Sequence, residues 1–211
     1  MRNLWCAFLF FLVACHGVNA DDECPNDPNG LSRADAVVEE PNDPNELVRA
    51  KWDAIILILQ NKDIDQKAKK SQIGKIITPV FDFPLMAKLV LGRTHWPKLT
   101  QPQSEKFTRL FTELLKTSYL AKISLYKDET ILFKPGVQKK KSVYVPTELV
   151  HKKRKVAILY KLRKVDKRWK IYDVEIQGVS ILLTYRSQFD EILRRGTVED
   201  LLSRLEKPPD D

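Results

Sequence analysis

The sequence has few of the residues on which catalytic and metal sites most often depend. It contains 3 histidines, and His16, His95 and His151 are too far apart along the chain to form a pair at metal-ligand spacing. It also lacks a Gly-x-Ser-x-Gly segment, a Cys-x-x-Cys pair and a glycine-rich phosphate loop. These absences argue against common hydrolase, redox and nucleotide-binding signatures. We therefore expect a protein that is not an enzyme and that needs no cofactor and no metal.

Cysteine is also scarce, and most of the cysteines lie in an N-terminal segment that the mature chain is expected to lose. Residues 1–20 combine the basic Arg2, an apolar run and the small-residue sequence Val-Asn-Ala before residue 21, which together predict a secretory signal peptide. Cleavage there leaves Cys24 alone, so the exported chain would have no internal disulfide. An alternative processing site exists, because residues 12–15 fit a lipoprotein box in which Cys15 would become the lipidated N-terminus.

Charge is distributed unevenly along the chain. Residues 21–46 hold nine acids and a single base, whereas residues 47–211 hold 34 bases and 19 acids. Residues 21–43 also contain few large apolar side chains, so we expect a disordered acidic leader. It would precede one domain over residues 44–207 and a short tail, 208–211. The basic domain favours anionic partners, and export makes nucleic acid the least suitable of these.

Hydrophobic periodicity predicts helices in the first half of this domain and strands in the second. Helices are expected over residues 44–60, 63–80, 84–91 and 100–126, and near the C-terminus after the capping residues Ser180 and Thr197. Strands are expected over residues 129–133 and 141–150 and in a hairpin over residues 156–176 that turns at 165–167. The prediction is an α+β fold with an antiparallel sheet of at least four strands.

The hairpin also predicts which side chains share a face of the sheet. Strict alternation would place Tyr172, Val174 and Ile176 on one face, and Ile171 and Asp173 on the other. The apolar stripe of the 100–126 helix carries four aromatic residues, more than one small sheet needs as cover. We expect this helix to face the apolar side of the sheet, where the two could enclose an apolar cavity.

Several segments, in order, resemble the MlaC family, also called toluene-tolerance auxiliary proteins. They are Phe-Asp-Phe at 81–83, Leu-Gly followed by Trp at 91–96, Asp-Val-x-Ile-x-Gly-Val-Ser at 173–180 and Tyr-Arg-Ser-Gln-Phe at 185–189. The resemblance covers roughly residues 44–206. It implies an NTF2-like α+β fold and a soluble periplasmic carrier that holds a phospholipid by its acyl tails. It further implies exchange of lipid with an inner-membrane ABC transporter, through its membrane-tethered substrate-binding subunit, and with an outer-membrane lipoprotein–porin complex.

A carrier of this kind must shield its cargo from water. Exposing one methylene costs about 0.8 kcal/mol, so exposing two acyl chains costs on the order of 20 kcal/mol. The predicted lipid-binding residues lie on the apolar faces of the helices and of the hairpin. They are Val90, Leu91, Phe107, Phe111, Leu115, Ile158, Tyr160, Val174, Ile176, Val179, Leu182 and Tyr185. Tyr160 and Tyr185 suit a boundary between lipid tail and water.

Two other functions are compatible with the same sequence. A hydrolase or isomerase could use the cavity with Asp82 or Asp173 as acid or base, and a structural envelope protein would have a filled core. We expect Asp173 to be hydrogen-bonded within the structure, and Arg186 to pair with Asp173 or with a phosphate. The basic segments 139–141 and 152–155 are solvated turns or docking sites for anionic membranes or acidic proteins.

Overall fold

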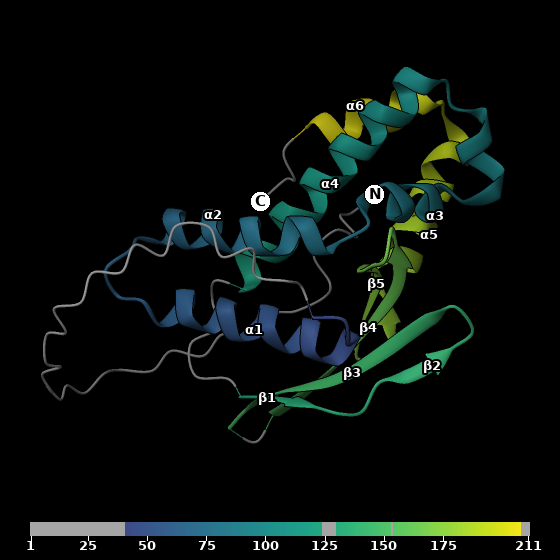
Figure 1. Cartoon of the computed structure of the whole chain (residues 1–211). Helices are drawn as coiled ribbons and strands as arrows, with labels where there is room; N and C mark the ends of the chain where they lie inside the picture. Colours follow the sequence, from purple (N-terminus) through teal and green to yellow (C-terminus); the bar gives the residue numbers. More distant parts are fainter. Residues whose placement is uncertain (1–40, 124–129, 153, 208–211) are drawn as a thin grey trace, which may run out of the picture. The chain divides into compact units, whose positions relative to one another are not determined.

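The computed structural model describes residues 41–123, 130–152 and 154–207 (Figure 1). The predicted signal peptide and nearly all of the predicted leader lie outside these residues, as do Glu129 and the end of the predicted 100–126 helix. Over the described ranges, no helix is both long enough and apolar enough to cross a bilayer.

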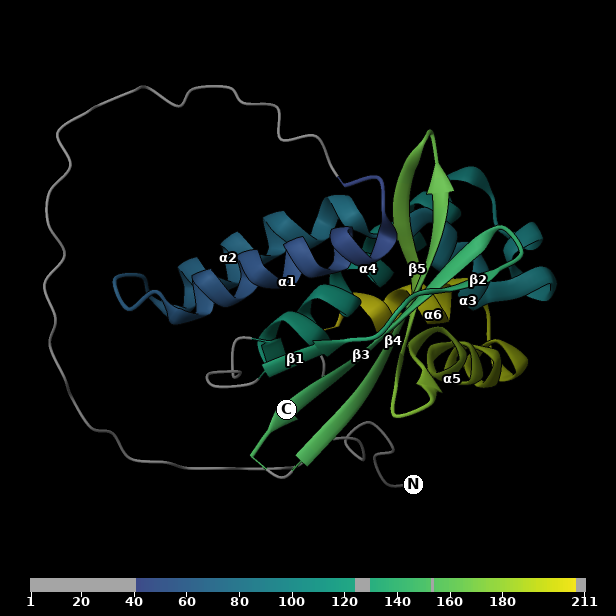
Figure 2. The ribbon, with the colours of Figure 1, turned by 60° about the horizontal axis from the view of Figure 1, so that its bottom comes forward.

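The described part of the chain begins with two antiparallel helices joined by a short loop. They are α1, Pro44–Gln60, and α2, Gln66–Ile77, which continues into a 3-10 turn, η1, Thr78–Val80. α1 starts where the sequence predicts, because the Asp43 carboxylate accepts hydrogen bonds from the backbone N–H groups of Asn45 and Glu46. α2 starts three residues later than predicted, because Asp65 caps it and not Asp63. The two helices lie side by side (Figure 2).

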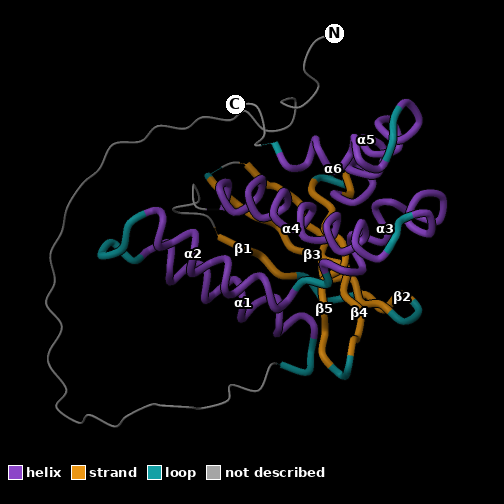
Figure 3. Tube along the Cα trace, turned by 90° about the horizontal axis from the view of Figure 1, so that it is seen from above, coloured by secondary structure: helices purple, strands orange, loops and turns teal. Residues whose placement is uncertain are grey.

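A second group of helices follows and is completed by the end of the chain. It comprises α3, Phe83–His95, the 3-10 turn η2, Trp96–Lys98, and α4, Gln101–Ile123, with α5, Ile181–Arg195, and α6, Val198–Glu206. The predicted caps are confirmed. Thr100 and Gln103 bond reciprocally at the start of α4, and Ser180 and Thr197 cap α5 and α6. Figure 3 shows α3, α5 and α6 on one side of α4, with α1 and α2 on its other side.

All six strands of the described residues form one antiparallel sheet. They are β1, Thr130–Phe133; β2, Val137–Lys139; β3, Ser142–His151; β4, Arg154–Val165; β5, Arg168–Ile176; and β6, Val179–Ser180. The order is β1-β3-β4-β5-β6, and β2 pairs with β3 beyond the end of β1. Pro146, which has no N–H to donate, lies opposite the break between β1 and β2. The α+β prediction, with at least four antiparallel strands, is confirmed.

The predicted faces of β5 are right for Val174, Ile176 and Asp173 but wrong for Ile171, because the strand contains a β-bulge. Tyr160 pairs with Val174, but Leu162 pairs with Ile171, so one extra residue is accommodated at Tyr172. The extra residue reverses the alternation, and Ile171 therefore shares the buried apolar face with Val174 instead of opposing it. We call this the inner face of the sheet.

Two separate apolar clusters hold the domain together. One joins the inner face of the sheet to α1, α2 and η1, with Leu47, Ile73, Val145 and Leu162 almost fully buried. The other lies among α3, α4, α5 and α6 and contains no buried strand residue among the described ones. The sheet therefore stabilises only one of the two helical groups directly through its apolar face.

Gly92 provides a test of how the second cluster is assembled. It has φ +62° and ψ −168°, a region essentially restricted to glycine, and it kinks α3. A Cβ there would lie 2.7 Å from Arg186 Nη2 on α5. We expect Gly92→Ala to lower the free energy of unfolding by about 1–3 kcal/mol in urea titrations.

Gly178→Ala is the matched control for that change. Gly178 also has a positive φ, +79°, but a Cβ there would meet no atom within 4 Å. Its substitution should therefore cost less stability than the change at Gly92. An equal or greater loss in Gly178→Ala would contradict the role assigned to the α3–α5 contact.

Candidate functional site

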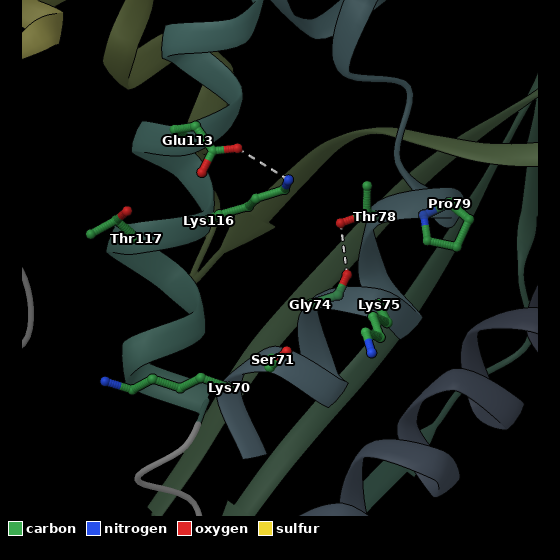
Figure 4. Close-up of a pocket in the computed structure, with 9 residues that line it drawn as sticks. All are labelled: Lys70, Ser71, Gly74, Lys75, Thr78, Pro79, Glu113, Lys116 and Thr117. Carbon is green, nitrogen blue, oxygen red and sulfur yellow. Dashed lines mark hydrogen bonds and ion pairs between the residues drawn. The ribbon is translucent and has the colours of Figure 1, made fainter. Parts of the chain in front are cut away.

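A cleft between α2 and α4 is the candidate ligand site. It has a volume of about 780 Å³, and its walls come from α2, η1 and the middle of α4 (Figure 4). The lining residues are Lys70, Ser71, Gly74, Lys75, Thr78, Pro79, Glu113, Lys116 and Thr117. The volume is within the range of roughly 300–1,000 Å³ that is typical of small-molecule sites.

The cleft exists because the facing surfaces of the two helices carry short side chains. Gly74 has no side chain, Ser71 precedes it by one turn of α2, and Thr117 lies on α4. Thr78 Oγ1 donates a 2.7 Å hydrogen bond to the Gly74 carbonyl oxygen, so this hydroxyl is held against its own helix. Only one residue of α2, Ile73, is buried. The helix is therefore less firmly packed than its neighbours, and the gap beside it is left unfilled.

The cleft has a basic rim. Lys116 forms a 3.2 Å ion pair with Glu113 on the same helix. Lys70 and Lys75 have no acidic oxygen within 4.0 Å among the described residues. Two unneutralised ammonium groups on α2 therefore favour an anionic group, such as a phosphate, at the opening.

Residue patterns in the sequence did not reveal this cleft. α2 has a weak apolar stripe, and Ser71, Gly74 and Thr117 are ordinary residues for a solvated helix. The gap depends on how α2 and α4 lie against each other in space. The only local signal is the coincidence of small side chains with lysines on α2.

None of the twelve predicted lipid-binding residues lines the cleft. Seven belong to the cluster among α3–α6 and are buried: Val90, Leu91, Phe107, Phe111, Leu115, Leu182 and Tyr185. Of the others, Tyr160 and Val174 are buried in the inner-face cluster, Ile158 and Ile176 are partly buried there, and Val179 is 46% exposed. The structure thus separates the set into two groups, and their contact with lipid stays a prediction.

The aromatic face of α4 packs against α5, which differs from the predicted contact with the sheet. Phe111 makes edge-to-face contacts with Tyr185 and Phe189, with ring centroids 5.5 and 5.8 Å apart. Phe107 contacts Phe189 in the same way at 5.7 Å. The extra aromatic residues that the sequence suggested for a cavity therefore pack against one another.

The two tyrosines expected at a water boundary are both buried. Tyr160 is 7% exposed, and its hydroxyl accepts a 2.8 Å hydrogen bond from Trp52 Nε1. Tyr185 is 9% exposed, and burial raises the pKa of its phenol despite the opposing effect of a hydrogen bond with Ser118. Burial likewise raises the pKa of Tyr119 on α4. The phenols of Tyr185 and Tyr119 therefore stay neutral over the physiological range.

The inner face of the sheet is incompletely covered toward one end. Tyr160 and Leu162 are buried there, whereas Ile131, Phe133, Ile158 and Ile176 are only partly buried. Thr147 pairs with both Phe133 and Ile158, so this apolar surface continues from β1 across to β4. The same side of the sheet packs against α1 and α2. Apolar surface thus remains available on the side of the sheet that these helices cover.

The two aspartates considered as catalytic groups are both engaged in structural contacts. Asp82 caps α3 by accepting from Leu85 N–H, and it pairs with Arg163 Nη2 at 2.6 Å. Asp173 accepts hydrogen bonds from Ser180 Oγ at 2.8 Å and from the backbone N–H of Leu182. The predicted structural role of Asp173 is confirmed.

Arg186 does not pair with Asp173. Its Nε lies 3.9 Å from Asp190 Oδ2 on the same helix, and its guanidinium group lies against Gly92. His95 also contacts Asp190, at 3.2 Å. Arg186 therefore belongs to the junction between α3 and α5. No group of three or more possible metal ligands occurs within the described ranges.

Lys161, on the face of β4 opposite the inner face, belongs to the polar network around Asp173. It pairs with Asp173 at 3.0 Å and with Glu175. Burial alone would lower the pKa of Lys161, but the hydrogen bonds with Glu175 and Asp173 raise it from 10.5 to about 12. This contribution to stability is complete below pH 10.5 and is lost as the pH rises through about 12.

Asp173→Asn tests whether this network stabilises the protein. The change removes the charge that faces Lys161 at a site only 5% exposed. We expect the free energy of unfolding to fall by about 2–4 kcal/mol in denaturant titrations. Glu175→Gln, which removes a more exposed partner of the same lysine, should cost clearly less. Equal losses in the two variants would show that the buried contacts of Asp173 are not the important ones.

Comparison with known proteins agrees with this architecture. A solved structure of a phospholipid-binding protein from Ralstonia solanacearum, in complex with a phospholipid, has a TM-score of 0.70 to this chain. The two are 24% identical, over 78% of this chain and 95% of that one, and at this identity the likeness shows the α+β fold. The model of the MlaC protein family matches residues 49–207, so the chain belongs to the MlaC family.

Proposed function

We propose that this protein is a phospholipid carrier that holds acyl tails between the inner face of its sheet and the helices α1, α2 and α4. Membership of the MlaC family supports a lipid-binding role. The likeness in fold to a phospholipid-binding protein supports it further. The observation that carries the proposal is the cleft between α2 and α4, which lies on the helical side of a sheet with incompletely covered apolar side chains.

In this mechanism, α2 is the element that moves when lipid enters. Its single buried residue, Ile73, makes it easier to displace than α1, which buries five residues. Displacement of α2 would widen the cleft and give tails access to Ile158 and Ile176. Burying two acyl chains recovers on the order of 20 kcal/mol, which greatly exceeds the cost of shifting one loosely packed helix.

The headgroup would stay at the mouth of the cleft. Lys70 and Lys75 are exposed there and carry no paired acid among the described residues, so they suit the phosphate that all phospholipids share. Ser71 and Thr117 add hydroxyl groups that can bond phosphate oxygens. This arrangement requires no covalent chemistry and no cofactor.

We further propose that the carrier works in the periplasm. The signal-peptide pattern of residues 1–20 supports export, with lipidation at Cys15 as the alternative form of the mature N-terminus. The partners proposed are an inner-membrane ABC transporter, with its membrane-tethered substrate-binding subunit, and an outer-membrane lipoprotein–porin complex. These assignments rest on the family resemblance.

Binding without catalysis is the function that the site supports best. The candidate acids Asp82 and Asp173 are both held by arginine, lysine or backbone groups, and neither lines the cleft. An acid or base working on a ligand would have to reach it, and within the described part of the chain the only acid that lines the cleft is Glu113, paired with Lys116. These contacts favour a carrier over a hydrolase or isomerase.

Lipid that co-purifies with the protein tests the proposal directly. We expect native mass spectrometry of the chain, purified without detergent, to show a phospholipid adduct near one per protein. Extraction followed by lipid mass spectrometry would identify it. A lipid-free protein that also fails to take up phospholipid from vesicles would refute the carrier function.

A second prediction tests the route of entry. Ser71→Trp combined with Thr117→Trp places bulky side chains on both walls of the cleft and should slow uptake of a fluorescent phospholipid from vesicles at least about ten-fold. Arg109→Trp is the control, because Arg109 is exposed on α4 and does not line the cleft. Unchanged uptake in the double variant, with a native far-UV spectrum, would show that tails enter elsewhere.

A further inference from the structure

A concentration of basic residues lies at one end of the sheet, outside the cleft. The β2–β3 turn contributes Lys139, Lys140 and Lys141, and the β4–β5 hairpin contributes Lys164, Lys167 and Arg168. All six side chains are exposed. We call these six residues the hairpin-tip surface.

The register of the sheet brings the two turns to the same end. Ser142, the first residue of β3, pairs with Arg163 of β4, so the residues just before Ser142 and just after Arg163 leave the sheet at neighbouring positions. The sequence separates these turns by more than twenty residues. The hairpin-tip surface therefore forms only in the folded chain.

The charges of the hairpin-tip surface are not neutralised internally. None of the six lies within 4.0 Å of an acidic oxygen among the described residues, and Asp166 is the only acid in the two turns. Neighbouring cations differ, because Arg163 pairs with Asp82 and Lys170 donates to the Pro79 carbonyl oxygen. Concentrated unpaired charge repels itself, so it favours an external polyanion.

The turn at the other end of the same strands provides an internal comparison. Lys155 there pairs with Glu148 at 4.0 Å, and Lys152 and Arg154 are each engaged with other groups. Both ends of the sheet are thus rich in basic residues. At this other end Lys155 has an ion pair, whereas none of the six residues of the hairpin-tip surface has one among the described residues.

We propose that the hairpin-tip surface docks the protein on an anionic lipid bilayer. Five of its six cations are lysines, which act as flexible point charges, whereas specific protein interfaces are enriched in arginine and aromatic residues and depleted in lysine. Clustered lysines near an anionic leaflet gain affinity with each added charge and need no defined partner geometry.

The backbone of the turns permits a test that does not damage the fold. Lys140 and Lys167 have φ values of +57° and +69°, which glycine adopts without strain. Lys140→Gly and Lys167→Gly therefore remove charge while keeping the backbone conformation. Lys152→Gly is the matched control, because Lys152 has φ +52° in the turn at the other end of the sheet.

The measurement is co-sedimentation of the purified chain with vesicles of phosphatidylcholine, with and without phosphatidylglycerol. We expect binding only to the anionic vesicles and weakening with added salt. Each of Lys140→Gly and Lys167→Gly should lower the partition constant about five-fold and the double variant about 25-fold. Lys152→Gly should change it by less than about two-fold, and thermal unfolding should be unchanged in all variants.

Three results would overturn the proposal. One is an equal loss in Lys152→Gly, which would indicate general charge attraction, and another is full binding by the double variant. The third is binding of the wild-type chain to polyglutamate but not to anionic vesicles, which would identify a docking surface for acidic proteins. Uptake of phospholipid into the cleft is measured separately, so failure of docking and failure of lipid carriage are distinguishable.

Discussion

The contacts of one buried carboxylate join the sheet to the second group of helices. Asp173, on β5, accepts hydrogen bonds from Ser180 Oγ and from the first turn of α5, and it pairs with Lys161 of β4. Ser180 in turn caps α5 by accepting from Leu183 N–H. The carboxylate thus lies where the positive end of the helix dipole stabilises negative charge. The entry angle of α5, and through it the position of the α3–α6 cluster, depends on these bonds.

This arrangement divides the molecule into parts with different packing. The α3–α6 cluster is closed by interlocking aromatic rings, and its buried phenols and phenylalanines leave little room for a ligand. The side that joins the sheet to α1 and α2 is less complete, with partly buried apolar residues and one helix that buries a single side chain. A tightly packed group of helices joined to a more loosely packed part suits a protein that must open without unfolding.

The elements of the fold are largely predictable from the sequence because their signals are local. Asp43 before Pro44, the reciprocal pair at the start of α4 and Ser180 before α5 each satisfy backbone groups within four residues of themselves. What could not be predicted depends on register or on distant packing. The bulge at Tyr172 leaves no mark in the alternation of residue types, and it is decided by pairing with β4.

The candidate site illustrates the same limit. Apolar periodicity identified Phe107 and Phe111 as inward-facing, but it could not tell whether they would meet the sheet or α5. The cleft depends on small residues of two helices that are distant in sequence, Gly74 and Thr117. Hydrophobic periodicity shows which side of a helix or strand is buried, but only the tertiary structure shows which element packs against that side.

The break between β1 and β2 at the edge of the sheet affects the tendency of the protein to aggregate. β3 is bordered by two short segments, β1 of four residues and β2 of three, separated opposite Pro146. Among the described residues, no long run of unpaired backbone groups is therefore presented to a second molecule along this border of the sheet. The chain can carry an apolar lining and still resist the strand-to-strand aggregation that such a composition invites.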